Sequence, residues 1–456
     1  MTRDHDLTTG PIPRLIARLA LPASIGYFFN TMYNVVDTFF GGLISTQVLA
    51  ALSFSLPIFF IIIAMGTGIA TGATALIANA LGAENREGAS VYALQGIGFG
   101  LLAGVAVTLF GVCTSPVLFS LLGASDAYLS MCLAYMNIIF LGTIFFMLVY
   151  MLNSILYALG DTRSFRNFLI AGFLLNILLD PWFIYGGIGL PAMGIAGIAV
   201  ATVLIQVIGC IYLGIKVFRT RLLAGKTLRD ALPVYAVVKE VAQQGLPASV
   251  NMITVGVGFF VITSFVSTFG EEAVAAYGIG IRIEQIALLP SIGLNVATLT
   301  LVAQNNGAKL FDRVRGILNA ALAYGGILMI AATILVFLLA RYLMVFFTDD
   351  VSVIEIGTTY MRIDCLVFYA YVILFTNIAA LQGVKKPMFA VWIGFFRQLV
   401  APIMLFYVLI NILDVGLLGI WWGFFAITWG AAIFSIFYTR VLLRDVINLA
   451  LAETSV

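Results

Sequence analysis

Two isolated acids inside long apolar segments are the residues best able to do chemistry in this chain. Asp37 is the only charged residue in the stretch 19–83, and Asp180 is the only one in the stretch 167–215. Asn176 precedes Asp180 by four residues, which places both side chains on one face of a helix. A buried carboxylate is costly unless it is paired or protonated. If the two carboxyl groups face each other, their titrations are coupled and the pair can exchange one proton.

The same oxygen-rich cluster could hold a sodium ion instead of a proton. Thr202, on the next apolar segment, could add a hydroxyl oxygen to the carboxyl and amide oxygens of Asp37, Asn176 and Asp180. The alternative is that both acids are polar packing residues, satisfied by neighbouring hydroxyl and amide groups. We favour the functional role, because an ionisable residue inside a membrane marks an ion or substrate pathway by default.

A proline lies fifteen residues before Asp37 in the same apolar segment. Pro22 removes one backbone hydrogen bond from a helix and makes a bend inexpensive. Protonation of Asp37 could therefore bias a bend lower in that helix. The alternatives are a static kink and a proline in the first helical turn. Pro247 occupies the equivalent place in the second half, with no acid further along its segment.

The second half carries intramembrane charges of its own, which sum to +1: Arg282, Glu284, Arg362, Asp364 and Arg397. We interpret them as a structural ion-pair network in the C-terminal lobe. Breaking such a network is expensive, while its presence need not mean transport. The alternative is that Glu284 or Asp364 is a second proton site.

The composition is typical of a polytopic membrane protein. Of the 456 residues, 62% are hydrophobic and only 10% are charged, and the mean hydropathy is +1.10. The net charge is only +2, and the basic residues are scattered over short loops. Both facts argue against a nucleic-acid partner. The apolar segments contain no P-loop, HExxH motif or Ser/His pair. We therefore expect no enzyme activity and no cofactor other than a coupling ion.

Apolar runs separated by charged or Gly/Pro breaks predict twelve membrane-spanning helices. Their predicted ranges are 15–43, 48–80, 91–115, 127–155, 166–187, 193–218, 235–268, 273–303, 316–346, 353–381, 388–411 and 417–442. These runs are too long for barrel strands, so the predicted fold class is an all-α polytopic bundle. Most of the 23 lysines and arginines fall in the loops on the side of both termini. That distribution places both termini in the cytoplasm.

The sequence contains an internal repeat with an offset of 225 residues. "LPAS" at 21–24 aligns with "LPAS" at 246–249, and "NALGA" at 79–83 aligns with "QNNGA" at 304–308. Six spans in each half give both lobes the same orientation, which is a parallel repeat used by transporters. The predicted parts are an N-terminal lobe over 1–218, a cytoplasmic linker over 219–234 and a C-terminal lobe over 235–456.

The sequence resembles the multidrug and toxic compound extrusion (MATE) family. The stretches that carry the resemblance are "LALPASIGYFFNTMYNVVDTFFGG", "ATGATALIANALGA", "VATLTLVAQNNGA", "LYALGDTR", "NILLDPWFIYG" and "GIAGIAVAT". An acid in the first span together with Asn-x-x-x-Asp in the fifth resembles the DinF-like branch of bacteria and archaea. The NorM-type branch instead has a Glu in span 7 and an Asp in span 10. Those positions fall near Val255 and at Tyr371 here, so that C-lobe site is missing.

The resemblance implies a set of site residues in the N-terminal lobe. The cation site would comprise Asp37, Asn176, Asp180 and Thr202, and the adjoining network would comprise Tyr33, Tyr135 and Asn153. It also implies a secondary antiporter, driven by H⁺ rather than Na⁺, that exports amphipathic and often cationic drugs by alternating access. We expect a monomer in the cytoplasmic membrane of a bacterium or archaeon.

Two other functions remain open at this point. One is a flippase for lipid-linked precursors, or another metabolite exporter of the same superfamily. Such flippases more often have a strongly cationic central cavity, whereas the intramembrane charge here is nearly balanced. The other is a channel, which would need neither alternating access nor a titrating pair.

Overall fold

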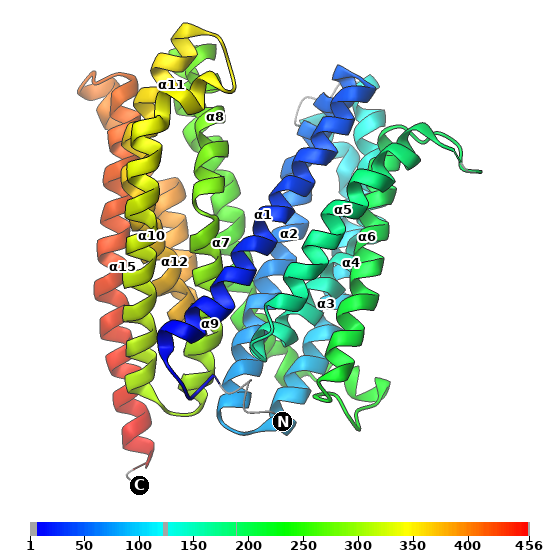
Figure 1. Ribbon diagram of the computed structural model, residues 1–456, viewed down its shortest axis with the longest axis vertical. Coiled ribbons are helices and arrows are strands. Elements are labelled where there is room, and N and C mark those ends of the chain that lie inside the picture. Colours follow the sequence, from blue (N-terminus) through cyan, green and yellow to red (C-terminus); the bar gives the residue numbers. More distant parts are fainter. Residues whose placement is uncertain (1–6, 122–125, 188, 455–456) are drawn as a thin grey trace. The chain divides into compact units, whose positions relative to one another are not determined.

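The computed structural model describes residues 7–121, 126–187 and 189–454, most of which lie in helices (Figure 1). Within these ranges there is no β-strand, only an isolated bridge between Gly187 and Leu190. The chain divides into two compact units. The N-terminal unit is Ile25–Val250, and the C-terminal unit combines Met1–Ser24 with Asn251–Val456.

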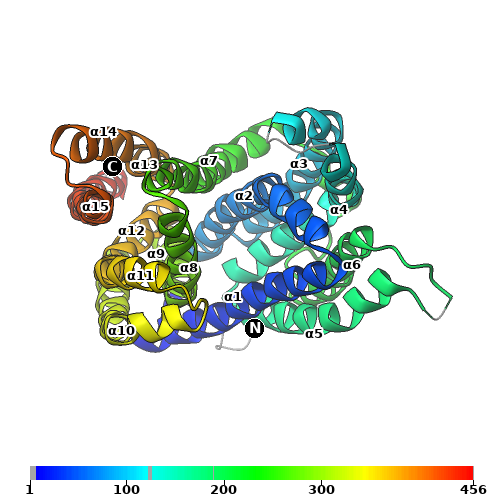
Figure 2. The same ribbon diagram turned by 90° about the horizontal axis from the view of Figure 1, so that it is seen from above.

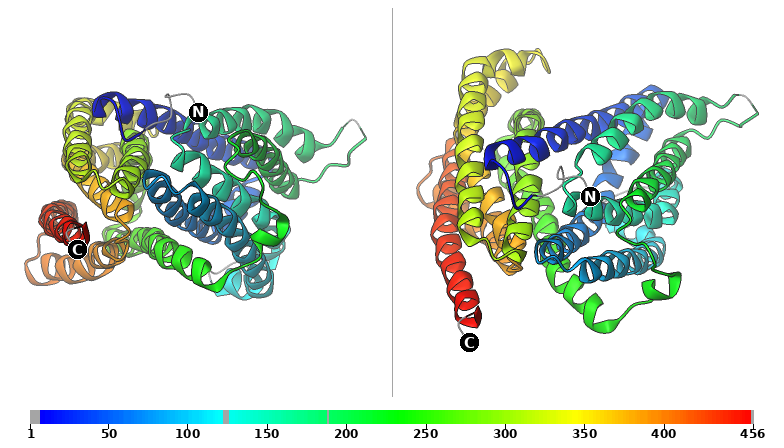
Figure 3. Two further views of the ribbon diagram at one scale, coloured as in Figure 1. Left: turned by 90° about the horizontal axis from the view of Figure 1, so that it is seen from below. Right: turned by 60° about the horizontal axis from the view of Figure 1, so that its bottom comes forward.

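The N-terminal unit is centred on α4, which contacts α2, α3 and α6. Its complete helices are α2 (Thr46–Gly82), α3 (Arg86–Leu121), α4 (Asp126–Ala158), α5 (Arg163–Tyr185) and α6 (Ile195–Arg219). The larger part of α1 (Ile12–Ile44) and the first half of α7 (Tyr235–Val266) belong to it as well. Helix α5 packs against α6, and the connection between them projects beyond the pair (Figure 3).

The C-terminal unit contains more and shorter helices. Its long or paired helices are α8 (Glu271–Ala287), α9 (Leu289–Gly307), α10 (Phe311–Val345), α11 (Val351–Asp364), α12 (Phe368–Gly383) and α15 (Leu417–Thr454). Its short elements are η3 (Ser267–Phe269), η4 (Cys365–Val367), α13 (Met388–Phe395), η5 (Phe396–Val400), α14 (Ala401–Tyr407) and η6 (Val408–Ile412). Helix α12 contacts α9, α10 and α15, and α11 contacts α8 and α10 (Figure 2).

The predicted spans coincide with helices or with series of helices. Within the described residues, ten helices or helix series are long and apolar enough to cross a membrane, and the α8–α9 pair, bent by 45°, makes eleven. The remaining predicted span, 15–43, corresponds to α1, a helix of 33 residues. It is long enough to cross, but Asn30, Asn34 and Asp37 make it more polar than the others. The all-helical polytopic fold is confirmed.

Two helices are shared between the units at equivalent places in the repeat. Helix α1 passes from the C-terminal unit to the N-terminal unit after Ser24, and α7 passes the other way after Val250. Pro22 and Pro247 lie inside these helices, just before the two crossing points. Because α1 begins at Ile12, Pro22 does not stand in its first turn. That alternative for Pro22 is therefore wrong.

Glycines allow α2 and α7 to approach closely within the N-terminal unit. A Cβ at Gly72 would lie 2.4 Å from the backbone nitrogen of Gly245. A Cβ at Gly68 would lie 2.3 Å from the backbone nitrogen of Ser249. Small residues four apart on both helices thus bring the backbones together, as in other membrane helix pairs.

The repeat preserves this contact inside the C-terminal unit. Gly293, the equivalent of Gly68, lies on α9 and faces the first part of α1. A Cβ at Gly293 would lie 2.4 Å from the carbonyl oxygen of Ala20 and 2.1 Å from Oγ of Ser24. The starts of α1 and α7 are therefore each fixed to a helix of the unit that they leave.

The linker after α6 is fastened to α3 by one buried glutamine. Nε2 of Gln95 donates to the carbonyl oxygens of Asp230 at 2.8 Å and Leu232 at 2.7 Å. Its Oε1 accepts from the backbone N–H of Val234 at 2.8 Å. One side chain thus satisfies three backbone groups of a segment that lies outside the long helices.

The same segment is held at two further points. The backbone and hydroxyl of Thr227 both donate to Asp230, at 2.7 and 2.9 Å, and form a capping box for the short helix η2 (Leu228–Ala231). These hydrogen bonds hold the pKa of the Asp230 carboxyl below its usual range. Lys226 forms an ion pair with Glu87 at the start of α3. The linker is therefore folded against the N-terminal unit.

The α2–α7 contact predicts that the same Gly→Ala substitution changes the stability of the protein differently at two positions. Gly72→Ala should destabilise the protein by about 1–3 kcal/mol, because the new methyl group meets the backbone of Gly245. Gly214→Ala, in α6 with open space around it, should be neutral or stabilising by up to about 1 kcal/mol through helix propensity. Thermal unfolding of the two purified variants in detergent checks this. Equal shifts in both would show that the contact is not tight.

Candidate functional site

Asn176 joins two carboxyl groups that come from different helices. Its Nδ2 donates to Oδ1 of Asp37 on α1 at 2.8 Å and to Oδ1 of Asp180 on α5 at 3.0 Å. The spacing of four residues places Asn176 and Asp180 on adjacent turns of α5. The two carboxyl groups also interact with each other. The structure thus brings together the three residues that the sequence predicted to face one another.

This cluster is largely buried and, among the described residues, has no positively charged neighbour. Asn176 and Asp180 are fully buried, whereas Asp37 is half-buried. No lysine, arginine or histidine is among the groups that act on either carboxyl. Two neighbouring carboxylates without a cation cannot both stay ionised at low cost in such surroundings. One added proton or one monovalent cation removes the repulsion between them.

Two acceptor atoms of the cluster have no hydrogen-bond donor. Oδ1 of Asn176 and Oδ2 of Asp180 are buried and unpaired. Leaving a buried acceptor unsatisfied costs about 1–3 kcal/mol. A proton placed on one of the carboxyl groups would supply a donor at this position. The cluster therefore lacks one hydrogen-bond donor, which a bound proton would supply.

Thr202, Tyr33 and Tyr135 surround the pair of carboxyl groups. Thr202 lies on α6, is buried, and donates its hydroxyl hydrogen to the carbonyl one turn back, at 2.9 Å, so only its lone pairs are left for the site. Tyr33 precedes Asp37 by one helical turn and faces Thr202 and both acids. Its hydroxyl makes no hydrogen bond of normal geometry. Tyr135, on α4, is buried, and both carboxyl groups lie near enough to act on its hydroxyl electrostatically.

Asn153 does not contact this cluster. It follows Tyr135 by 18 residues in α4, which corresponds to about 27 Å along the helix axis. There it is buried and interacts with Tyr157, which interacts in turn with Tyr27 and Tyr150. This second polar cluster was missed from the sequence. Its signal was the spacing of Tyr150, Asn153 and Tyr157, which places them on one helix face.

The charged residues of the C-terminal unit do not form the predicted ion-pair network. Glu284, Asp364 and Arg397 are buried. Arg282 and Arg362 are exposed, because each stands two residues from its acid and so points to another side of the helix. In the described part of the chain, no ion pair within 4.0 Å includes any of the five.

Three aromatic side chains flank the buried acids of the C-terminal unit. The rings of Tyr277, Tyr360 and Trp421 have centroids 4.6 to 5.9 Å apart. They were not predicted from the sequence, although the spacing of the two tyrosines from the acids places them on the same helix faces. Tyr277 precedes Glu284 by two turns, and Tyr360 precedes Asp364 by one.

The comparison with family models repeats the division of the chain into two halves. The MatE model matches residues 22–182 and again residues 247–408. The two matches begin 225 residues apart, the offset found by aligning the halves. The internal repeat is therefore confirmed. Asp37, Asn176 and Asp180 all lie in the first match.

Individual proteins match over most of their length. The chain is 28% identical over 420 residues to "Probable multidrug resistance protein NorM" of Thermotoga maritima, covering 91% of this chain and 89% of that protein. It is 25% identical over 354 residues to "Multidrug export protein MepA" of Staphylococcus aureus, covering 77% of each. A solved structure described as "Crystal structure of MATE in the straight conformation" matches with a TM-score of 0.91 and 26% identity, over 98% of this chain and 99% of that one. With the family model matched over more than half of its length, the chain belongs to the multidrug and toxic compound extrusion (MATE) family of membrane transporters.

Proposed function

We propose that this protein is a proton-coupled antiporter that exports amphipathic, often cationic, small molecules. Its family makes it a multi-pass membrane transporter, and the names of both relatives describe multidrug resistance or export. The observation that carries the coupling is the single amide of Asn176 held between the carboxyl groups of Asp37 and Asp180. That arrangement lacks one positive charge and one donor, and a proton supplies both.

A proton fits the cluster better than a sodium ion does. Sodium would have to take its oxygens from Asp37, Asp180, the amide of Asn176 and Thr202. A proton needs only one of the two carboxyl oxygens that now compete for Asn176.

Protonation would change the contact between α1 and α5. As long as both carboxyl groups accept hydrogen bonds, Asn176 holds α1 to α5 through Asp37. A protonated carboxyl becomes a donor and can bind the unpaired Oδ1 of Asn176 instead. We infer that a proton from outside enters at half-buried Asp37 and alters the position of α1. Pro22 makes the lower part of that helix easy to bend. This movement would drive release of the drug without direct use of ATP.

The finer assignments are part of the proposal. We place the chain in the DinF-like branch, because α1 carries an acid and α5 carries the Asn-x-x-x-Asp pattern. The place of the NorM-type acid in span 10 is taken by Tyr371, which is buried in α12. We also propose a monomer in the cytoplasmic membrane with both termini inside. The excess of basic residues in the loops next to the termini supports that orientation.

Two transport assays separate the coupling ions. In proteoliposomes loaded with a fluorescent cationic drug, an imposed H⁺ gradient should drive transport with equal Na⁺ on both sides. An Na⁺ gradient at equal pH should not. Transport that follows only the Na⁺ gradient would overturn the choice of ion, and flux that ignores both gradients would indicate a channel.

Asp37→Asn should reduce coupled efflux to the level of empty liposomes. The amide matches the carboxyl in size and polarity but cannot bind and release a proton. Efflux measured at equal membrane abundance checks this, and Asp312→Asn on the exposed start of α10 serves as the matched control that retains activity. Wild-type efflux by Asp37→Asn would refute coupling through this cluster.

Pro22→Ala should slow turnover at every pH without preventing folding or drug binding. Restoring the backbone donor and straightening the helix adds roughly 3 kcal/mol against the bent form. That shift takes a balanced equilibrium to about 1 in 150. The comparison is Pro247→Ala, at the matching position in α7 with no acid further along. We expect a milder effect there, and an equal loss in both variants would refute a bend linked to Asp37.

A further inference from the structure

Three membrane spans of the C-terminal unit each contain one break in regular α-helical geometry, whereas their counterparts in the N-terminal unit contain none. Only the break between α8 and α9 bends the span sharply, and the other two are turns of 3-10 or π-helix inside a continuous span. Helices α8 and α9 meet at Leu288 with a bend of 45°. Helix α11 passes into α12 through the 3-10 turn η4, and α13 passes into α14 through the π-helical turn η5. The equivalent helices α2, α4 and α5 run unbroken over 37, 33 and 23 residues. A turn of 3-10 or π-helix inside an α-helix often marks a functional site.

Each break carries one buried ionisable residue. Glu284 stands one turn before the bend, and its carbonyl accepts from Leu288 N–H at 2.9 Å. Asp364 is the last residue of α11, and Arg397 lies within η5. At the offset of 225, the equivalent residues of the N-terminal unit are Phe59, Ile139 and Gly172. This cluster is therefore not a repeat copy of the site at Asp37.

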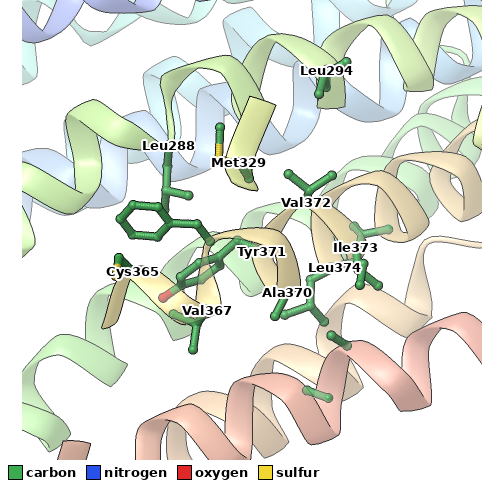
Figure 4. Packing of buried hydrophobic residues seen from close by; sticks show 14 of the residues in the cluster. Leu288, Leu294, Met329, Cys365, Val367, Ala370, Tyr371, Val372, Ile373 and Leu374 are labelled. Carbon is green, nitrogen blue, oxygen red and sulfur yellow. The ribbon is translucent and has the colours of Figure 1, made fainter. Parts of the chain in front are cut away.

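The broken spans meet in one packing cluster. Figure 4 shows Leu288 at the α8–α9 bend together with Cys365 and Val367 of η4 and Tyr371 of α12. Arg397 joins this group, because its guanidinium lies over the ring of Tyr371, 5.3 Å from the centroid. The ionisable residues at the three breaks thus belong to one region.

The charges in this region do not balance. Arg397 lies near enough to Glu284 to act on it electrostatically, although the two side chains form no ion pair within 4.0 Å. No cation acts on Asp364, whose electrostatic neighbours are Glu284 and Tyr360. Asp364 is only 2% exposed, and neither of its carboxyl oxygens accepts a hydrogen bond of normal geometry. Two acids and one base leave one negative charge without compensation, which a buried site does not tolerate.

The groups around Asp364 offer no alternative compensation. The titratable groups that face the cluster are Glu284 and Tyr277 from α8, Tyr360 from α11, Cys365 from η4, Tyr371 from α12 and Arg397 from η5. Helices α10 and α15 also contact α11, but no titratable group on them acts on Asp364. Within the described residues, no group of three or more His, Cys, Asp or Glu side chains gathers here. The ligand that fits is a single proton.

We propose that Asp364 is a second proton-binding site of this transporter, loaded in the conformation seen here and emptied during the transport cycle. Arg397 supplies the means of emptying it, because its Nη1 is buried without a hydrogen-bond partner. A shift of η5 toward the end of α11 would bring this donor to the Asp364 carboxylate, and the proton would leave to water. That Asp364 exchanges its proton during transport rests on the proton coupling proposed above. That Asp364 is protonated in this conformation does not rest on it.

The first test measures how many protons move with each drug molecule. The drug gradient that balances an imposed pH gradient in proteoliposomes gives the ratio of protons to drug. Asp364→Asn should lower that ratio by about one proton while efflux continues, and the exposed Asp349→Asn should leave it unchanged. An unchanged ratio in Asp364→Asn would overturn the exchange. Loss of all coupling in Asp37→Asn reports on the first site alone, so failures of the two proposals are distinguishable.

The second test detects the proton directly and needs no transport. In the Asp37→Asn, Asp180→Asn double variant, pH-difference infrared spectra should still show a band of a protonated buried carboxyl. The band should vanish when Asp364→Asn is added. If that triple variant fails to fold, the same infrared spectra of the double variant with Glu284→Gln added test the assignment instead. Removing the neighbouring carboxylate should keep the band and lower the pH at which it disappears. Absence of a band in the double variant, or its loss with Glu284→Gln, would overturn the assignment to Asp364.

Discussion

Every polar group that this chain carries into the membrane must find its partner within the protein, since lipid offers none. Hydroxyl side chains solve the problem locally. Thr31, Thr38 and Ser55 each donate to the carbonyl one turn back in their own helix. A carboxylate has no hydrogen to donate, so it must recruit a donor from elsewhere or take a proton. The site at Asp37 follows from that constraint, because Asn176 is the donor recruited from another helix.

The same constraint is met in different ways in the two halves. The N-terminal unit keeps its helices continuous and resolves the charge with an amide placed between two acids. The C-terminal unit bends one span, places a turn of 3-10 or π-helix in two others, and surrounds its acids with tyrosines, a tryptophan and one arginine. The repeat thus gives both halves one scaffold without giving them one chemistry. The stretches that resemble the family follow the shared scaffold and do not include the cluster around Asp364.

The sequence was sufficient for what depends on local pattern. Apolar runs gave the positions of the helices, although α15 (Leu417–Thr454) runs well beyond its predicted end at residue 442. The i,i+4 spacing placed Asn176 beside Asp180. It did not reveal the break after Asp364, because neither glycine nor proline stands at Cys365 to mark it. Nor did it separate Asn153 from the acids, since that depends on where along α4 the other helices cross. The partners of Arg397 likewise depend on tertiary packing and not on spacing.

Because Gln95 of α3 binds only part of the inter-lobe linker, a reporter peptide should be tolerated at some linker positions and not at others. Ala224 and Gly225 are exposed, and a Cβ at Gly225 would meet nothing within 4 Å. An insert between them would lie before every backbone group that Gln95 binds. An insert only eight residues later would separate Val234 from Asp230 and Leu232 and so disrupt the set of backbone groups that the same glutamine binds. A fluorophore at the first place would therefore leave the contact between the linker and α3 intact.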